Sequence, residues 1–229
     1  MAIADNISQT QQQIAQFEQN HQRAADSVKL LAVSKTKPVS AIEDAYAQGQ
    51  RLFGENYVQE AADKSQQLAH LEGIEWHFIG PIQSNKTRIV AESMHWVHTL
   101  DRAKIALRLN EQRPSNLAPL NVCIQVNISG EESKSGISLA ELDEMVEIVG
   151  QQSNLILRGL MAIPAPQISL SAQVATYQPL YQAYQALADK IVTVDTLSIG
   201  MSGDMEAAIA SGSTMVRIGT AIFGARNYA

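Results

Sequence analysis

The sequence has almost no cysteine and no long apolar run. Cys123 is the only cysteine among 229 residues, which excludes an intrachain disulfide and a zinc site built on several thiolates. It lies in the apolar segment NVCIQVNI, where packing in the core is its expected role. No apolar run approaches the roughly 20 residues that a membrane-spanning helix needs. Because the first residues also lack the basic and apolar regions of a signal peptide, we expect a cytoplasmic protein.

Basic residues are in the minority. Lys and Arg number 17 against 23 Asp and Glu, which gives a formal net charge of −6. A nucleic-acid-binding protein usually carries a basic excess, so we expect no nucleic-acid partner. Hydrophobic residues make up 45% of the chain and charged residues 17%, as in an ordinary globular domain. These proportions still leave room for a local basic site that binds a small anion.

The five histidines form no recognisable metal-binding motif. His95 and His98 stand nearest to each other, but on a strand their side chains would face opposite sides. No carboxylate accompanies a histidine pair at the spacing of a metallohydrolase site. We therefore expect no metal ion.

Short apolar runs divide the chain, and most of them are followed by a segment with helical spacing. The runs lie at residues 28–34, 52–54, 75–80, 96–100, 121–128, 155–163, 196–201 and 215–224. Several are apolar on successive residues, as strands buried on both faces are. The alternation predicts an α/β fold, a single (β/α)8 TIM barrel spanning residues 1–229. An open doubly wound sheet is the alternative.

The helix signals are clearest in four segments. Residues 1–22 repeat apolar side chains near helical spacing and predict an extra N-terminal helix. Residues 38–49 begin with a proline and end with a glycine, and residues 138–150 open on a Ser-x-x-Glu capping box. Residues 172–191 carry a tyrosine and leucine stripe that is typical of packing. The proline-bearing segment 162–173 is interpreted as a loop after the sixth strand.

In such a barrel, function gathers where the strands end, and the last two runs end in glycine-bearing segments. Gly203 and Gly219 would let backbone N–H groups approach an anion, while Ser202 and Thr220 add hydroxyl donors. The two segments together predict a phosphate site, with ordinary turns as the alternative. GMSGD also approaches the Gly-x-Ser-x-Gly pattern of serine hydrolases, but Asp204 replaces the final glycine.

The segment LLAVSKTKP, residues 30–38, places Lys35 at the end of the first predicted strand. A lysine condenses with an aldehyde when its amine is neutral in a confined site. Across the barrel mouth from a phosphate site, Lys35 would suit a phosphorylated aldehyde such as pyridoxal 5'-phosphate (PLP) or a sugar phosphate. An exposed lysine at a strand end, with no such role, is the alternative.

Five segments resemble a known family. LLAVSKTKP, LFGENYVQE, WHFIGPIQSNK, GLMAI and LSIGMSGDMEAAIASGSTMVRIGTAIFGARNY are similar, in this order, to the YggS/PROSC family of PLP homeostasis proteins. The resemblance covers the chain from about residue 28 to its end. It implies a barrel like the N-terminal domain of alanine racemase and PLP as the cofactor.

The resemblance also implies which residues bind the cofactor. Lys35 matches the lysine that forms the Schiff base, and Arg217 matches the arginine beside the pyridine nitrogen. Without the resemblance, a structural ion pair would be the better interpretation of Arg217. Three residues match the positions that bind the phosphate, namely Ser202, Gly219 and Thr220. Three others match positions that line the cofactor, namely Asn56, His77 and Met201.

The implied function is PLP homeostasis inside the cell, with no catalytic residue assigned. The protein would hold PLP as a Lys35 aldimine and deliver it to apo-enzymes, acting as a monomer. Lys37, Lys64 and Lys134 could assist the exchange, although solvated surface lysines are the more ordinary interpretation.

Two enzyme classes are the alternatives. A PLP-dependent amino-acid racemase of low activity would need a second catalytic base, yet only ARNYA follows the eighth run. Tyr228 is too near the terminus to replace that base with confidence. Arg217 beside the pyridine nitrogen would also weaken the cofactor as an electron sink. The other alternative is a Schiff-base aldolase acting on sugar phosphates.

Overall fold

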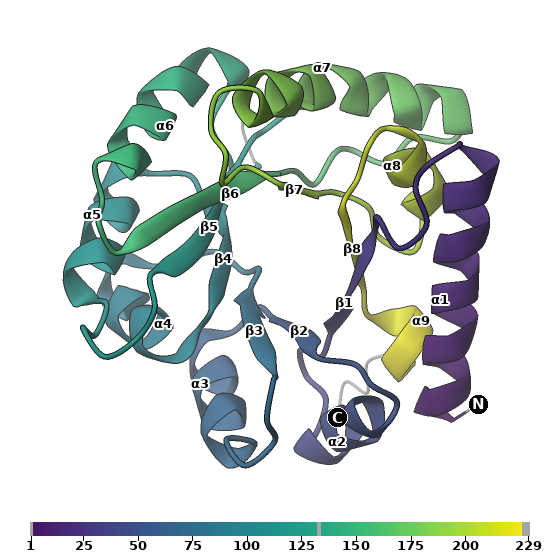
Figure 1. Ribbon diagram of the computed structural model, residues 1–229, viewed down its shortest axis with the longest axis horizontal. Helices are drawn as coiled ribbons and strands as arrows, with labels where there is room; N and C mark the ends of the chain where they lie inside the picture. Colours follow the sequence, from purple (N-terminus) through teal and green to yellow (C-terminus); the bar gives the residue numbers. More distant parts are fainter. Residues whose placement is uncertain (1, 132–133, 226–229) are drawn as a thin grey trace.

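Eight parallel strands form a closed barrel in the computed structural model, which describes residues 2–131 and 134–225. Each strand pairs with the next along the chain, and β8 returns to pair with β1. Figure 1 shows the helices outside this ring of strands. The structure confirms the predicted (β/α)8 barrel and excludes the open doubly wound sheet, which would leave two unpaired edges.

The elements alternate along nearly the whole chain. The strands are β1 Lys29–Val33, β2 Leu52–Glu55, β3 Glu75–Phe78, β4 Trp96–Leu100, β5 Leu120–Gln125, β6 Leu155–Met161, β7 Thr196–Ser198 and β8 Met215–Ile218. The α-helices are α1 Ile3–Asn20, α2 Val39–Ala47, α3 Val58–Gln67, α4 Thr87–Ser93, α5 Ala103–Gln112, α6 Leu142–Gly150, α7 Leu170–Ala188, α8 Met205–Ala210 and α9 Thr220–Phe223. Two 3-10 turns, η1 Ser84–Lys86 and η2 Leu139–Glu141, precede α4 and α6.

The predicted strands all exist, but several are shorter than their apolar runs. The run at residues 215–224 holds β8 and then the short helix α9. The predicted loop at residues 162–173 ends earlier, because α7 begins at Leu170 with Ser169 as its N-cap. The predicted capping box of Ser138 is present and starts the helical turn that leads into α6.

The predicted N-terminal helix is present as α1 and packs against the last part of the chain. Ile7 and Ile14 are buried on its inner face. The Asn6 side-chain amide donates to the Ile222 carbonyl, and Arg23, just beyond the helix, donates to the Ile209 carbonyl. Figure 1 accordingly shows α1 alongside α8 and α9. The first helix thus covers the region where the barrel closes.

One glycine is required for β6 to pair with β7. Gly159 has φ +148° and lies opposite Thr196 in the ladder. A Cβ atom at residue 159 would lie 1.7 Å from the Thr196 carbonyl oxygen. Any larger residue would therefore push β7 away from the barrel wall.

The single cysteine lies in the protein interior. Cys123 is fully buried on β5 and packs against Trp96 and Met161. Burial raises the pKa of its thiol to about 12, so the sulfur stays protonated and unreactive. Among the helices described, none is long and apolar enough to cross a membrane.

Candidate functional site

A cavity of about 330 Å³ opens at the carboxyl ends of the strands. Its volume lies in the range of about 300 to 1,000 Å³ that is usual for small-molecule sites. The lining comes from the ends of β1, β2, β3, β6, β7 and β8 and the loops after them. The lining residues are Val33, Lys35, Asn56, Ile79, Ile163, Met201, Ser202, Gly203, Arg217, Gly219 and Thr220.

Lys35 reaches this cavity from a tight turn. Its neighbour Ser34 is fully buried, and the Lys37 backbone N–H donates to the Ser34 carbonyl at 3.1 Å. Lys35 itself is partly buried at the cavity wall. The turn therefore fixes where the lysine leaves the barrel strand.

The turn after β7 carries the first predicted anion-binding residues. Asp204 fixes this turn, because its two oxygens accept from the Met201 backbone N–H at 2.7 Å and the Tyr177 hydroxyl at 2.5 Å. Burial and the Asp204 charge raise the pKa of Tyr177, which keeps its hydroxyl a proton donor. Ser202 and Gly203 lie exposed between these two anchors.

The turn after β8 carries the second set of predicted anion-binding residues. Gly219 is partly buried and Thr220 is exposed at the start of α9. Both line the same cavity as Ser202. The two glycine-bearing segments thus meet at one side of one site, where their N–H and hydroxyl groups could receive an anion.

Arg217 is the buried cation of the site. Its side chain donates to the Ser198 carbonyl at 2.6 Å, the Ser198 hydroxyl at 2.9 Å and the Ala162 carbonyl at 3.0 Å. Burial lowers its pKa from the ordinary value, but a guanidinium stays protonated in proteins. These neutral acceptors replace the structural ion pair that sequence reasoning offered as an alternative. Arg217 thus presents a fixed positive charge to the cavity.

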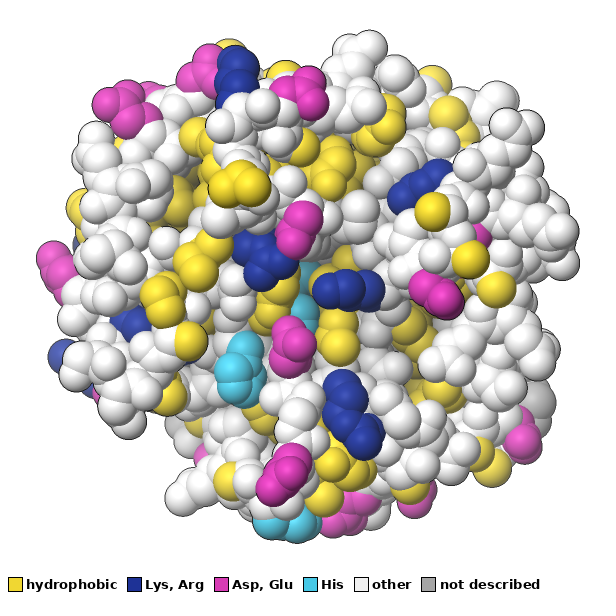
Figure 2. Space-filling view, viewed as in Figure 1, with side chains coloured by type: hydrophobic (Ala, Val, Ile, Leu, Met, Phe, Trp, Pro, Cys, Tyr) yellow, Lys and Arg dark blue, Asp and Glu magenta, His cyan; other side chains and the backbone are white. Residues whose placement is uncertain are grey.

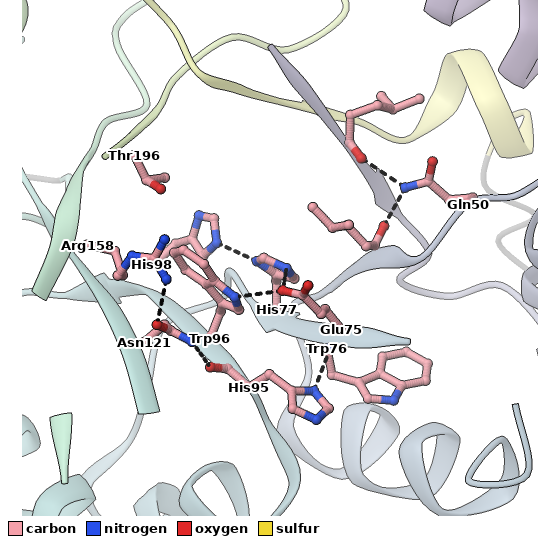
Figure 3. A network of polar contacts seen from close by, with 12 residues as sticks. Gln50, Glu75, Trp76, His77, His95, Trp96, His98, Asn121, Arg158 and Thr196 are labelled. Atoms are coloured by element: carbon pink, nitrogen blue, oxygen red, sulfur yellow. Dashed lines mark hydrogen bonds and ion pairs between the residues drawn. The ribbon is translucent and has the colours of Figure 1, made fainter. Parts of the chain in front are cut away.

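A chain of hydrogen bonds runs from Arg217 into the barrel interior. The Ser198 hydroxyl lies 2.8 Å from Nδ1 of His98. Nε2 of His98 in turn lies 2.9 Å from Nδ1 of His77 (Figure 3). His77 stacks on Trp96, with ring centroids 5.1 Å apart. Its remaining nitrogen, Nε2, is buried and lies 3.8 Å from a Glu75 carboxylate oxygen.

The two histidines are held neutral. Burial lowers the pKa of His98 to about 3, with a further contribution from the Arg217 charge. Burial also places the pKa of His77 well below its ordinary value. His95 is turned to a different partner, since its Nδ1 accepts from the Trp76 backbone N–H.

Beside Lys35 lies a buried ionic group formed by Glu55, Glu60 and Lys64. The Lys64 ammonium is 2.8 Å from Glu55 and 2.7 Å from Glu60, and its residue is only 5% exposed. Lys64 is therefore not the solvated surface lysine that the sequence suggested. Burial raises the pKa of Glu55, while Lys64 and Ser34 oppose that shift.

Comparison with known proteins identifies the family. The family model described as "Alanine racemase, N-terminal domain" matches residues 2–227. The pyridoxal phosphate homeostasis protein of Escherichia coli strain K12 is 57% identical over 228 residues, covering 99% of this chain and 97% of the relative. The protein of the same name from Vibrio alginolyticus is 58% identical over 230 residues, covering 99% of each. The chain belongs to the pyridoxal phosphate homeostasis protein family.

One solved structure of similar fold contains bound PLP. PipY of Synechococcus elongatus, with PLP bound, superposes with a TM-score of 0.82 at 32% identity. The match covers 97% of this chain and 100% of PipY.

Most of the residues that the family resemblance assigned lie together. Seven of them line the cavity described above: Lys35, Asn56, Met201, Ser202, Arg217, Gly219 and Thr220. His77 does not line it; the residue is fully buried and contacts His98. Lys37 donates to the Ala225 carbonyl and Lys134 pairs with Glu131. Tyr228 lies outside the described residues.

Sequence reasoning missed the residues that support this lining. Ser198 and His98 support Arg217, Asp204 supports the turn after β7, and Glu55 ends β2 beside Ser34. One signal was available for Glu55, because a carboxylate at the end of an apolar strand needs a partner. For Ser198 and His98 the partner is about a hundred residues away, which no local pattern reveals.

Proposed function

We propose that this protein binds PLP through Lys35, keeps the reactive aldehyde covered, and delivers the cofactor to apo-enzymes in the cytoplasm. The observation that carries this proposal is one cavity that contains a lysine, an arginine and two anion-binding turns. PLP has one functional group for each, namely an aldehyde, a pyridine nitrogen and a phosphate. The names of the relatives and the PLP bound to PipY support the same cofactor.

The residues of the site fit the parts of PLP. Ser202, Gly219 and Thr220 offer hydroxyl and backbone donors for the phosphate. Lys35 would supply the amine that condenses with the aldehyde, releasing water. A recipient's lysine amine would then take the cofactor by transimination, which releases the Lys35 amine and no water. Asn56 and Met201 line the same cavity. His77 enters the proposal only through its contact with His98.

Arg217 favours a carrier over a catalyst. When bound, PLP supplies an electron sink for amino-acid chemistry, and the sink is strongest with a protonated pyridine nitrogen. Arg217 has donors only and keeps its charge, so it would oppose protonation of that nitrogen. Its buried side chain is held in place by hydrogen bonds to the Ser198 and Ala162 carbonyls. Sustained racemisation is therefore disfavoured.

The position of Lys35 can be tested chemically. Purified protein with PLP is reduced with borohydride and digested, and the adduct is located by mass spectrometry. We expect the adduct on Lys35, and PLP binding at least about tenfold weaker in Lys35→Ala, a loss of about 1.4 kcal/mol or more. Lys29→Ala is the matched control, since Lys29 begins the same strand at the opposite end of the barrel. An adduct confined to another lysine would reject this site.

A second measurement separates the carrier from the racemase. The holoprotein is incubated with saturating L-amino acids in deuterated water, and exchange of the α-proton is followed by NMR. The carrier proposal expects no exchange above that of free PLP with the same amino acids. Exchange at enzyme-like rates, on the order of 1 per second or faster, would favour the racemase instead.

A further inference from the structure

The residue after Lys35 has an unfavourable backbone conformation. Thr36 has φ +62°, in the left-handed region that β-branched residues rarely adopt. Such a conformation is unfavourable and persists only where its surroundings hold it. The contacts on either side of Lys35 show what holds it here.

The ionic group of Glu55, Glu60 and Lys64, termed the Lys64 cluster, binds both neighbours of Lys35. On one side, the Ser34 hydroxyl donates to Glu55 Oε1 at 2.6 Å, and the Ser34 carbonyl accepts from Lys64 at 2.7 Å. On the other side, the Thr36 backbone N–H donates to Glu60 Oε1 at 2.6 Å. The cluster therefore fixes the backbone immediately before and immediately after Lys35.

The ammonium of Lys64 is fully used within the cluster. Its three N–H donors have three acceptors, namely the Ser34 carbonyl, Glu55 Oε1 and Glu60 Oε1. Lys64 does not line the cavity, and its ammonium points to these three acceptors instead. Lys64 is therefore excluded as a partner in cofactor exchange, and its role is to hold other groups in place.

The members of the cluster come from two neighbouring elements. Glu55 ends β2, while Glu60 and Lys64 lie one turn apart on α3. Glu55 is fully buried and Glu60 is partly exposed, with a side-chain exposure of 23%. The cluster thus ties the turn after β1 to rigid neighbouring elements, which is what precise placement of a reactive side chain requires.

We propose that Glu60 and Lys64 are positioning residues for Lys35, holding its turn in the strained conformation that directs the amine into the cavity. The inference rests on the proposed function, in that Lys35 is taken as the residue that binds PLP. Glu60 is the most informative member, because it bonds the strained residue directly and lies near the surface. Fixing the turn before the ligand arrives lowers the ordering cost of binding.

Two substitutions of Glu60 test the proposal. Glu60→Ala removes the acceptor of the Thr36 N–H, whereas Glu60→Gln keeps an oxygen at that place. We expect PLP binding about tenfold weaker in Glu60→Ala, the factor that corresponds to about 1.4 kcal/mol, and within about twofold of wild type in Glu60→Gln. Glu43→Ala on α2 is the matched control, since Glu43 is an exposed glutamate outside the cluster.

Hydrogen exchange of the apo-protein gives a readout that does not depend on PLP. The Thr36 amide should exchange at least about tenfold faster in Glu60→Ala and stay protected in Glu60→Gln and Glu43→Ala. Melting temperatures measured on the same samples separate a local change from general unfolding. Unchanged PLP affinity in Glu60→Ala, or equal exchange of the Thr36 amide in all variants, overturns the proposal. Wild-type protein whose adduct is not on Lys35 rejects the proposed function instead, and the amide exchange still decides whether the cluster holds the turn.

Discussion

At the scale of single residues, the histidine chain beneath Arg217 has a defined direction. Arg217 can only donate, so the buried Ser198 hydroxyl accepts from it and offers its own proton to Nδ1 of His98. His98 then carries its proton on Nε2 and donates to Nδ1 of His77. The proton of His77 is left on Nε2, toward Glu75. This order requires both rings to be neutral, as their burial also demands.

A pH dependence of stability follows from the buried histidines. The pKa of His98 is lowered from 6.5 to about 3 in the folded protein, so only the unfolded chain gains this proton between those values. Stability is therefore complete above about pH 6.5 and falls as the pH is lowered through that value. His98 alone should cost about 1.4 kcal/mol between pH 7.5 and 5.5, and His77 adds a loss of the same sign.

Urea unfolding of wild type and His98→Gln at pH 7.5 and 5.5 measures this effect. When the pH is lowered from 7.5 to 5.5, the free energy of unfolding should decrease in both proteins. The decrease should be about 1.4 kcal/mol smaller in His98→Gln than in wild type. His70→Gln, a substitution at an exposed histidine on the surface, should keep the wild-type dependence. Equal pH dependence in all three proteins would contradict the assignment.

Local pattern in the sequence pointed to part of the cavity lining, and the family resemblance added Asn56, Met201 and Arg217. Lys35 lies at the end of a predicted strand, and the glycines beside Ser202 and Thr220 indicate backbone that can approach a ligand closely. Lys64 could not be predicted in this way, because nothing in a glutamine-rich helix distinguishes a buried lysine from a solvated one. Its burial depends on Glu55, which reaches it only once β2 and α3 are packed.

At the scale of elements, β6 depends on a single glycine. Gly159→Ala would place a methyl group against the Thr196 carbonyl in a backbone conformation that alanine rarely adopts. We expect a loss of more than about 3 kcal/mol in the free energy of unfolding, or failure to fold. The reason is that the new methyl group clashes with backbone atoms, which cannot move aside as a flexible side chain can. Urea unfolding and soluble yield provide the measurement.

The chain offers a matched control for this substitution. Gly150 ends α6, and a Cβ atom there would meet nothing within 4 Å. Gly150→Ala should leave stability unchanged or raise it by up to about 1 kcal/mol, since alanine restricts the unfolded chain. A Gly159→Ala protein as stable as Gly150→Ala would show that β7 can move freely.

The elements themselves were more predictable than their ends. Hydrophobic periodicity and capping residues predicted α1, α2 and α6. Both signals lie within a single short segment of the sequence, so they can be recognised without the structure. The division of residues 215–224 into β8 and α9 is not visible in composition, since both parts are apolar. It arises because the chain must turn at Gly219 once β8 has completed the barrel.

At the scale of the whole molecule, closure of the barrel explains why the two ends of the sequence depend on each other. β1 pairs with β8, and α1 packs on the helices that flank β8. Glu18 of α1 is buried and accepts from the Val28 backbone N–H at the entry to β1. The turn after β8, which we propose binds the phosphate, therefore forms beside the first part of the chain. The number of predicted strands was enough to predict the barrel. The packing of α1 over the closure between β1 and β8 could be seen only in the structure.

We expect the protein to be a monomer, because its outer helices present few apolar side chains. Nine large apolar side chains are exposed among the described residues. Two of them lie on α-helices, Leu107 on α5 and Leu170 on α7, and the other seven lie in loops and turns. On the face shown in Figure 2, hydrophobic side chains are divided by polar and charged ones. A permanent dimer usually buries about 2,000 Å² or more, with an apolar centre, and these helices offer no such surface. We therefore expect a species of 24.9 kDa by light scattering coupled to size exclusion, with and without PLP. A mass of twice that value that persists on dilution to about 1 μM would contradict a monomer. A permanent dimer stays associated at this concentration, because its dissociation constant is well below about 1 μM.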